Sequence, residues 1–280
     1  MIGAHAEART HIDMKNDATY SLNIGGRLLE WTEPLVMGIL NVTPDSFFAD
    51  SRQQTEEDIA LRARQIAEEG AAIIDVGGYS TRPGASEVSE EEELRRLRLA
   101  LGIVKREVLE MVLSVDTFRA SVAEKMADEF GPFIVNDVTG GTDLDMFPTV
   151  SKLGLPYVLT NVGNTALSLT LAESISRLRE FGQCDIIIDP GFGFGKTLEE
   201  NYDVMRQLEA YRELGLPLLV GVSRKSMIYR LLDITPDKAL NGTTVLHTLA
   251  LQSGANILRV HDVREAVEAI KIVSMVKGEK

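Results

Sequence analysis

Charged and amide side chains recur in this chain at one kind of position, directly after a short apolar run. The residues in these positions are Asn41, Asp75, Asp116, Asn136 with Asp137, Asn161, Asp189, Ser223 with Lys225, and Arg259 with His261. Carboxylate and amide oxygens accept hydrogen bonds from ring N–H and amino groups, whereas cationic side chains hold anionic oxygens. If these positions converge in space, they predict a site for a ligand with two unlike ends, a donor-rich heterocycle and an anion.

A simpler explanation exists for each residue taken alone. Asp, Asn and Ser are good N-caps, so any one of them could begin the helix that follows it. Arg259, Lys225 and His261 do not fit that explanation, because the positive end of a helix dipole repels cations. Asp75 stays open between an N-cap and a polar partner inside the core. For the set we expect carboxylates and amides on one side of a common opening and cations on the other.

The acceptors define the expected heterocycle. Asp116, Asn136 and Asp189 suit a guanidine-like edge, such as the 2-amino-4-oxo face of a pterin or of guanine. Lys225 is placed to donate to the ring carbonyl or to a ring nitrogen. These four residues therefore predict the heterocycle end of the site.

The cations and two long loops define the anion end. Arg259 and His261, beside Asn41, suit phosphate oxygens and a metal ion. Polar loops at residues 41–53 and 77–93 exceed the roughly two to six residues that are usual between a strand and its helix. Long loops beside an active site are candidates for lids, and surface decoration is the alternative.

The apolar runs alternate with longer amphipathic stretches, and this alternation predicts the fold. The β-like runs cover residues 35–42, 72–78, 112–118, 133–138, 156–162, 185–191, 216–223 and 256–262. Their near-continuous apolar character is typical of strands buried on both faces of a parallel sheet. Eight strand–helix units in 280 residues predict the α/β class and a (β/α)8 TIM barrel, whose C-terminal strand ends meet at one mouth. A doubly wound open sheet is the alternative fold.

The N-terminal region is expected to differ from the barrel. Residues 20–31 predict a small β-hairpin with Gly25-Gly26 in its turn. We expect residues 1–19 to form a flexible extension and residues 20–280 to form a single domain, because no stretch rich in Pro, Gly or Ser divides the chain. Thr55 is the expected N-cap of a helix over residues 55–71.

Composition argues against several functional classes. The net charge of −13 disfavours a broad nucleic-acid surface, which needs clustered Lys and Arg, but permits a local anion site. The one cysteine, Cys184, rules out an internal disulfide. No apolar run approaches the ~20 residues of a membrane span, and residues 1–20 lack the pattern of a secretory signal. We therefore expect a cytoplasmic protein without a nucleic-acid or membrane partner.

The stretch "DIIIDPGFGFGKT" at residues 185–197 tests a competing site, a phosphate-binding P-loop. That loop requires Gly, four residues and then Gly-Lys-Ser/Thr, which would put its first Gly at position 190. The chain has Pro190 there, which offers no N–H, and Asp189 would lie near the phosphates. The pattern instead favours a barrel loop of small residues, with Lys196 either near the substrate or facing solvent.

Seven motifs, taken in this order, resemble those of the dihydropteroate synthase family. They are "MGILNVTPDSF", "GAAIIDVGGYSTRPGA", "LSVDTFRASVAEKM", "FIVNDVTGG", "DIIIDPGFGFGKT", "LLVGVSRKSMI" and "ILRVHDVREAVEA", and the resemblance runs from about Leu35 to Val276. It implies a homodimeric, Mg²⁺-dependent transferase with one pterin-binding TIM-barrel domain. The implied reaction condenses 6-hydroxymethyl-7,8-dihydropterin diphosphate with p-aminobenzoate to give 7,8-dihydropteroate and diphosphate. We expect diphosphate loss through a cation-like pterin, followed by attack of the amine.

The resemblance also implies roles for the residues that match these motifs. The implied pterin pocket comprises Asp116, Asn136, Asp189, Lys225 and Gly221. The implied diphosphate site comprises Asn41, Thr81, Arg82, Arg259 and His261, with Asn41 also near the metal ion. The implied p-aminobenzoate site comprises Ser223, Phe194, Gly193 and Arg82. The expected catalytic residues are Asp116, Asp45, Lys225, Arg259 and His261.

One departure from the family concerns the fifth strand. Thr160 stands where the family usually has a Met that packs on the pterin, and the loop after Val162 is shorter than is usual. Loss of that apolar contact predicts weaker pterin binding. Two other functions stay open: a pterin-binding methyltransferase domain that serves a corrinoid, and a pterin-binding protein that has lost catalysis.

Overall fold

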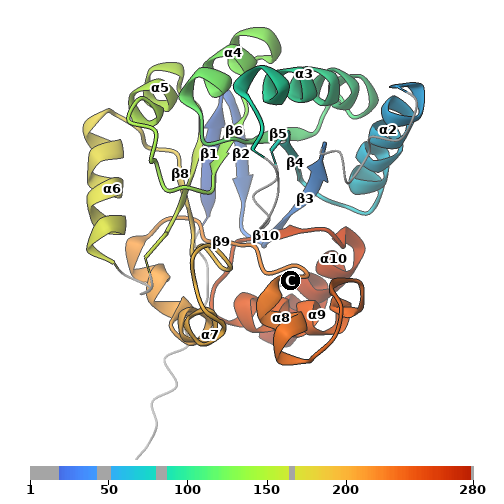
Figure 1. The fold of residues 1–280 in the computed structure, drawn as a ribbon. Helices are drawn as coiled ribbons and strands as arrows, with labels where there is room; N and C mark the ends of the chain where they lie inside the picture. The colour runs from blue at the N-terminus through green and yellow to red at the C-terminus, as the bar shows by residue number, and fades with distance from the viewer. Residues whose placement is uncertain (1–18, 43–51, 80–86, 164–167, 279–280) are drawn as a thin grey trace, which may run out of the picture.

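The centre of the molecule is a nearly closed barrel of parallel strands (Figure 1). The computed structural model describes residues 19–42, 52–79, 87–163 and 168–278. The barrel strands in this part of the chain are β3 (Leu35–Asn41), β4 (Ile73–Gly77), β5 (Val112–Asp116), β6 (Ile134–Asp137), β7 (Tyr157–Thr160), β8 (Ile186–Asp189), β9 (Leu219–Val220) and β10 (Ile257–Val260). They pair in the order β8-β7-β6-β5-β4-β3-β10-β9, and a parallel bridge between Ile188 and Leu218 joins the two edges. The TIM-barrel prediction is confirmed.

Helices follow the barrel strands in the chain and surround them (Figure 1). The α-helices are α2 (Arg52–Glu68), α3 (Glu90–Glu107), α4 (Ala120–Phe130), α5 (Met146–Leu153), α6 (Leu169–Glu180), α7 (Leu198–Arg206), α8 (Ser226–Leu231), α9 (Leu240–Gln252) and α10 (Val263–Lys277). Two 3₁₀ segments, η1 (Leu208–Leu214) and η2 (Pro236–Lys238), lie in the connections. Thr55 is buried inside α2, so its expected role as N-cap is wrong.

Local sequence explains why individual helices begin where they do. The Ser89 side chain accepts a hydrogen bond from Glu92 N at the start of α3, and four glutamates in the first turn complement the helix dipole. Thr197 and Glu200 form a capping box at the start of α7. These caps fix where the preceding loops end, which is at the rim of the barrel.

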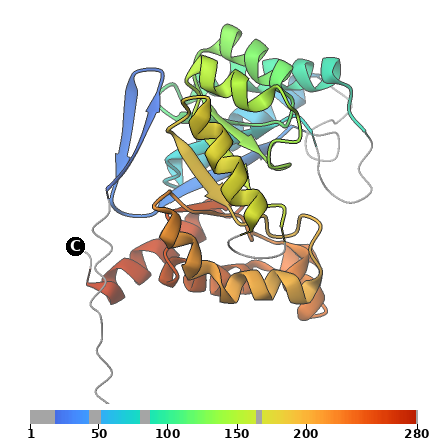
Figure 2. The same cartoon turned by 90° about the vertical axis from the view of Figure 1, so that its left-hand side faces the viewer.

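An antiparallel hairpin covers one end of the barrel (Figure 2). It consists of β1 (Tyr20–Ile24) and β2 (Arg27–Trp31) with Gly25-Gly26 in the turn, as predicted. Its apolar side chains pack against the first inward-facing residues of the barrel strands, and the cluster comprises Leu22, Ile24, Trp31, Met37, Ile73, Val112, Ile134, Val158, Ile187, Leu219 and Ile257. We call this cluster the floor. The predicted extension at residues 1–19 lies, except for its last residue, outside the described residues.

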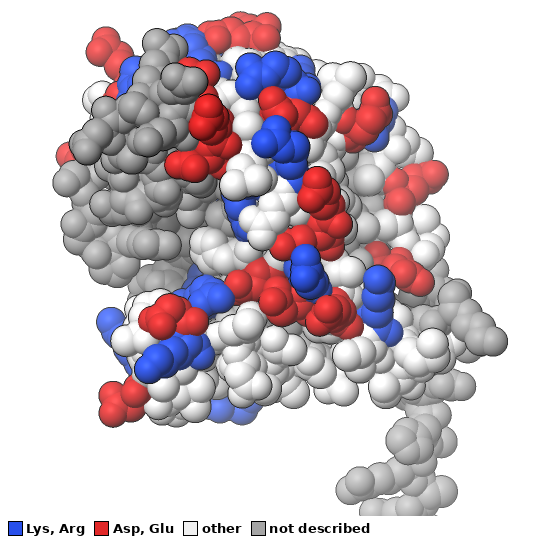
Figure 3. All heavy atoms as spheres, turned by 90° about the vertical axis from the view of Figure 1, so that its right-hand side faces the viewer, with Lys and Arg blue, Asp and Glu red and all other residues white. Residues whose placement is uncertain are grey.

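The described surface mixes both signs of charge. On the face drawn in Figure 3, acidic and basic side chains are interspersed, and Arg64 of α2 pairs with Glu107 of α3. In the described part of the chain, no helix is long and apolar enough to cross a membrane. Cys184 is a free, exposed thiol that precedes β8.

Candidate active site

The barrel interior changes from apolar to polar one step above the floor. Side chains two positions apart on a strand point to the same side, so each floor residue is followed inside the barrel by the residue two positions later. On seven of the eight strands this next inward position is polar or Gly, and these positions are Asp75, Ser114, Asn136, Thr160, Asp189, Gly221 and Arg259. The C-terminal strand ends therefore form one polar mouth, as predicted.

Asp75 is the hub of this polar layer. It is fully buried, and its Oδ1 accepts from Ser114 Oγ at 2.6 Å. Its Oδ2 accepts from Asn136 Nδ2 at 3.1 Å and from Arg259 Nε at 2.7 Å. Of the two roles that the sequence left open, the core partner is therefore the right one, and Asp75 fixes side chains of β5, β6 and β10 across the barrel interior.

Arg259 lies between two carboxylates. Its Nη2 donates to Asp116 Oδ2 at 2.7 Å, while its Nε bonds Asp75. The expectation that the cations stand across the opening from the acids is wrong for Arg259. A buried charge without an opposite partner is costly, so the guanidinium and the two carboxylates lie in direct contact. Burial works to lower the pKa of Arg259, but Asp75 and Asp116 raise it above its ordinary value.

Asp116 titrates unusually high for a carboxylate. Burial raises the pKa of Asp116 to about 7, Arg259 opposes this shift, and the charges of Asp75 and Glu93 add to it. Asp116 lies at the end of β5, where its side chain borders the mouth next to Gly77. A carboxyl group with this pKa is a functional-site candidate, because its charge changes near neutral pH.

Asn136 has a buried hydrogen-bond acceptor in the polar layer. Its Nδ2 donates to Asp75, but its buried Oδ1 has no hydrogen-bond partner in the described protein. A buried polar atom without a partner costs free energy and calls for an explanation. A ligand with an N–H group would supply the missing donor, as the sequence predicts for the heterocycle.

The loop after β8 is built from backbone hydrogen bonds rather than from a phosphate cradle. Asp189 Oδ1 accepts from Gly191 N at 2.7 Å. Lys196 Nζ donates to Asn161 O and to Gly191 O, both at 3.0 Å, so it ties the loop to the end of β7 rather than extending freely into solvent. Its place near the substrate stays a prediction. Gly191 and Gly193 have φ of 72° and 83°, and a side chain at Gly191 would start 2.4 Å from Asn161 O.

Lys225 reaches into the same loop. Its Nζ donates to Phe192 O and lies 4.7 Å from the centre of the Phe194 ring. Burial lowers the pKa of Lys225 to about 8, although Asp189 opposes the shift and Arg259 adds to it. A side chain at Gly221 would start 3.9 Å from Lys225 Nζ and 3.8 Å from Arg259 Cβ, so this Gly leaves space between the two cations.

The remaining predicted residues lie on three neighbouring strand ends. His261 N donates to Ser223 Oγ at 3.1 Å, and Arg62 of α2 donates to His261 O at 2.6 Å. Asn41 Oδ1 lies 3.1 Å from the point where a side chain at Gly77 would start. The predicted Asp45, Thr81 and Arg82 lie outside the described residues.

The sequence reading missed Glu93, a buried carboxylate on α3. It accepts from Thr117 Oγ1 at 2.7 Å and pairs with Arg119, whose Nη2 donates to Val88 O at 2.9 Å. Glu93 thus joins the residue after Asp116 to the start of α3. Its spacing of four from Leu97 puts it on the buried stripe of the helix, and that signal could have found it.

The donor set suits a metal ion that arrives with its substrate. Among the described residues, no group of three or more His, Cys, Asp or Glu side chains could hold a metal ion. Mg²⁺ usually takes one or two protein oxygens together with substrate phosphates. The Asn41 amide oxygen is a donor of that kind at the mouth.

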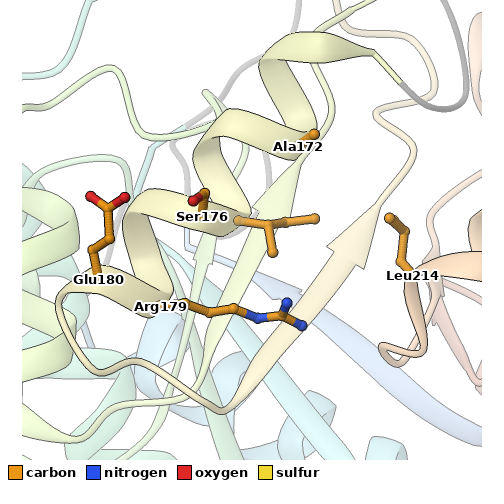
Figure 4. Close-up of a pocket in the computed structure, with 6 residues that line it drawn as sticks. Ala172, Ser176, Arg179, Glu180 and Leu214 are labelled. Carbon is orange, nitrogen blue, oxygen red and sulfur yellow. The ribbon is translucent and has the colours of Figure 1, made fainter.

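A surface cavity of about 490 Å³ lies elsewhere, between α6 and η1 (Figure 4). Its lining comprises Ala172, Ile175, Ser176, Arg179, Glu180 and Leu214. Figure 4 shows Arg179 extending from α6 toward the η1 side. This cavity is on the outside of the barrel and contains none of the residues that converge at the mouth.

Comparison with known proteins agrees with the geometry. A profile of the family described as pterin binding enzyme matches residues 37–261. The dihydropteroate synthase of Escherichia coli (strain K12) is 38% identical over 265 residues, which cover 89% of this chain and 93% of that protein. Xanthomonas albilineans dihydropteroate synthase, solved with 4-aminobenzoic acid, has a TM-score of 0.85 and 37% identity, covering 93% of this chain and 99% of that one. A Coxiella burnetii dihydropteroate synthase in complex with pteroic acid has a TM-score of 0.81 and 33% identity, covering 93% and 100%.

Proposed function

The chain belongs to the dihydropteroate synthase family of pterin binding enzymes, and from that premise we propose how its barrel mouth performs the reaction. The enzyme is a transferase that joins 6-hydroxymethyl-7,8-dihydropterin diphosphate to p-aminobenzoate. The observation that carries our assignment of the site is the unpaired amide oxygen of Asn136 beside the Asp75–Arg259–Asp116 network. We assign residues 20–280 to a single pterin-binding domain.

The pterin ring binds above the Asp75 layer. Asn136 Oδ1 and the carboxylates of Asp116 and Asp189 accept from its amino and ring N–H groups. Lys225 donates to the ring carbonyl or to a ring nitrogen, which requires its Nζ to exchange the Phe192 carbonyl for the ligand. Gly221 leaves room for the ring beside Lys225. The pteroic acid complex of the Coxiella burnetii relative supports this assignment.

The diphosphate binds at the cationic side of the mouth. Arg259 has five N–H donors, and its two carboxylate partners engage Nε and Nη2, so Nη1 stays available for a phosphate oxygen as far as the described residues are concerned. His261 and Asn41 complete the assignment among the described residues. Thr81 and Arg82, together with the catalytic role of Asp45, remain predictions from the family motifs.

The p-aminobenzoate binds beside the loop after β8. Ser223 Oγ accepts from His261 N at the end of β10, and Gly193 and Phe194 lie beside Lys225 in that loop. Arg82 is the further predicted contact. The complex of the Xanthomonas albilineans relative with 4-aminobenzoic acid supports a site for this substrate.

The reaction breaks the bond between the pterin methylene carbon and the diphosphate oxygen before the new bond forms. The electron-rich dihydropterin delocalises the positive charge that this leaves, and the carboxylate of Asp116 favours it electrostatically. Arg259 and His261 hold the charge that develops on the departing diphosphate. The aromatic amine then forms the C–N bond and releases its proton, without a covalent enzyme intermediate. Asn41 would hold a Mg²⁺ ion together with the substrate, and the ion would supply neutralisation of the phosphate charge.

The test is release of diphosphate when p-aminobenzoate is supplied with the pterin diphosphate. We expect stoichiometric formation of dihydropteroate and inhibition by a sulfonamide that competes with p-aminobenzoate. Pterin binding without release would instead indicate the protein that has lost catalysis, and methyl transfer to a corrinoid would indicate the methyltransferase. Chelation of Mg²⁺ should abolish release while leaving the unfolding transition unchanged, because no described cluster needs a metal to fold.

We also propose that two copies associate through the face formed by α8, α9 and α10. Exposed large apolar side chains gather there, and they are Leu231, Leu232, Val245, Leu249, Ile272, Met275 and Val276. The lower central part of Figure 3 carries few charged side chains. A cluster of exposed apolar side chains such as the one on these three helices indicates a protein interface. The free thiol of Cys184 fits the reducing cytoplasm in which we place the enzyme.

Light scattering after size exclusion tests the assembly. The chain of 30.8 kDa should migrate as a dimer, and Leu249→Glu should convert it to a monomer. Leu109→Glu is the matched control, since Leu109 is also exposed but follows α3. A dimer that survives Leu249→Glu and Ile272→Glu together would contradict this interface.

A further inference from the structure

Arg224 has an unusual backbone conformation at a critical place. It lies between Ser223 and Lys225, to which we assign p-aminobenzoate and the pterin, and its φ is 53°. Among the described non-glycine residues only Asp233 shares a positive φ. The left-handed conformation is strained for a residue with a side chain. Such strain persists only where the surroundings over-determine the conformation.

The side chain of Arg224 supplies that restraint. Its Nε and Nη2 each bond one oxygen of Asp262 at 2.8 Å, which is a two-pronged ion pair. Its Nη1 donates to the carbonyls of Pro236 and Asp237 in η2, at 3.1 and 2.7 Å. The backbone N–H of Arg224 donates to Thr243 Oγ1 of α9 at 3.0 Å. The residue is therefore clamped on three sides.

The contacts of Arg224 lie where the backbone pairing between β9 and β10 has ended. β9 has only two residues, and its ladder with β10 ends at the pair Val220–Leu258. Beyond that pair the two strand ends are tied by side chains: His261 N to Ser223 Oγ, and Arg224 to Asp262. Ser223 pairs with His261 and Arg224 with Asp262 at the same sequence offset as Val220 with Leu258. The side-chain contacts therefore continue the register of the ladder up to the mouth.

This arrangement also separates the directions of three neighbouring side chains. The side chain of Arg224 turns to η2 and to the start of α10, while Ser223 meets the backbone of His261 and Lys225 reaches Phe192 O. A relaxed backbone at position 224 would rotate both neighbours away from these contacts. In the described part of the chain, the hydrogen-bond partners of Arg224 all lie outside the Asp75 layer.

We propose that Arg224 and Asp262 form a positioning clamp that sets Ser223 and Lys225 at the mouth, so that Arg224 governs p-aminobenzoate binding without touching substrate. This inference rests on the proposed function. Neither residue belongs to the pterin, diphosphate or p-aminobenzoate sets assigned above. Both are positioning residues, and they act through the backbone between β9 and α8 and through the start of α10.

Steady-state kinetics of three variants test the clamp. Arg224→Gly permits the left-handed φ but removes the side chain, Arg224→Lys keeps the charge without the two-pronged pair, and Asp262→Asn weakens the partner. We expect Arg224→Gly and Asp262→Asn each to raise KM for p-aminobenzoate by roughly tenfold, because small misplacements of a binding group are costly. Arg224→Lys should have a smaller effect, and the double variant should be no worse than Arg224→Gly alone.

Control variants and controls on folding distinguish failure of the clamp proposal from failure of the proposed function. Arg98→Ala removes a two-pronged surface pair with Glu129 and should leave both KM values unchanged. Urea unfolding of each variant distinguishes a local change from loss of the fold. If Arg224→Gly keeps the wild-type KM for p-aminobenzoate, or if its effect and that of Asp262→Asn add fully, the clamp is overturned. Failure of the wild-type chain to release diphosphate would overturn the proposed function instead.

Discussion

The floor and the mouth of the barrel are built from the same eight strands with opposite kinds of side chain. At the floor, residues such as Ile73 and Ile187 pack against the hairpin and exclude water. Two positions further along the same strands, Asp75 and Asp189 belong to a layer of charges and hydrogen bonds. The step from one environment to the other is a single pleat of each strand.

This difference separates the source of stability from the source of function. Burial of apolar surface at the floor stabilises the fold by roughly 25 cal/mol per Å². At the mouth, Asp75 and Asp116 share the guanidinium of Arg259. Exchange of such a whole buried ion cluster for apolar residues of similar volume usually costs little stability. We therefore expect changes at the floor to alter unfolding but not turnover, and changes at the mouth to alter turnover whether or not they also alter unfolding.

The largest expected effect comes from removing the cation that both mouth carboxylates share. Arg259→Ala should lower kcat by about 10³-fold, because a preorganised donor to the leaving group is lost. It should also cost about 3–5 kcal/mol of unfolding free energy, since a buried ion pair is broken. Kinetics and urea titration measure the two effects. Arg259→Lys should recover part of each, and a fully active Arg259→Ala would contradict the assigned role.

The second effect is confined to the floor. Trp31→Ala removes a large buried ring of the hairpin and should cost about 3–5 kcal/mol in unfolding free energy while kcat stays within about twofold. Trp31→Phe is the matched control, because it keeps a ring and removes the buried Nε1, which has no partner in the described protein. A loss of kcat in Trp31→Ala without a change in unfolding would show that the two ends are coupled.

The third effect concerns pH and belongs to the mouth alone. The carboxylate of Asp116 forms as pH rises through about 7, and the ammonium of Lys225 is lost as pH rises through about 8. The kcat/KM for pterin diphosphate should therefore fall about tenfold per pH unit below the lower value and above the upper one. Lys225→Arg, which stays charged, should remove only the basic limb. A basic limb that persists in Lys225→Arg would exclude Lys225 as its source.

The smallest expected effect concerns pterin binding at Thr160, which lies in the polar layer directly above the floor. Thr160→Met restores the apolar side chain usual in the family and should tighten pterin binding about threefold through added apolar contact. Thr160 Oγ1 donates to Asp137 O at 2.8 Å, and Thr160→Val removes this hydrogen bond alone as a control. Isothermal titration with the pterin measures both variants. Weaker binding by Thr160→Met than by Thr160→Val would contradict an apolar contact at this position.

Much of the fold could be predicted because each strand is an apolar run bounded by a polar residue. Parallel barrels bring such boundaries together, so the convergence of Asp116, Asn136, Asp189 and Lys225 followed from topology alone. The short β9 did not follow, since the run from residue 216 is apolar as far as Val222 but only two of its residues pair in the ladder.

The contacts inside the mouth could not be predicted in the same way. The sequence has no signal for the distance between Arg259 and Asp75, which lie 184 positions apart. Nor does a run of four glutamates indicate by itself that Glu93 is buried, although the helical stripe distinguishes it. The roles of Asp45 and Arg82 stay predictions, because those residues lie outside the described part of the chain.

The left-handed glycines of the loop after β8 have a consequence for inhibition. A compound that rests on Gly191 and Gly193 would meet mostly main chain, whose shape point mutations change little. Any other residue at Gly191 would collide with the carbonyl of Asn161, and one at Gly193 would crowd Lys225 at 3.3 Å. Resistance through either position would thus carry a fitness cost, which makes this loop a durable anchor for drug design.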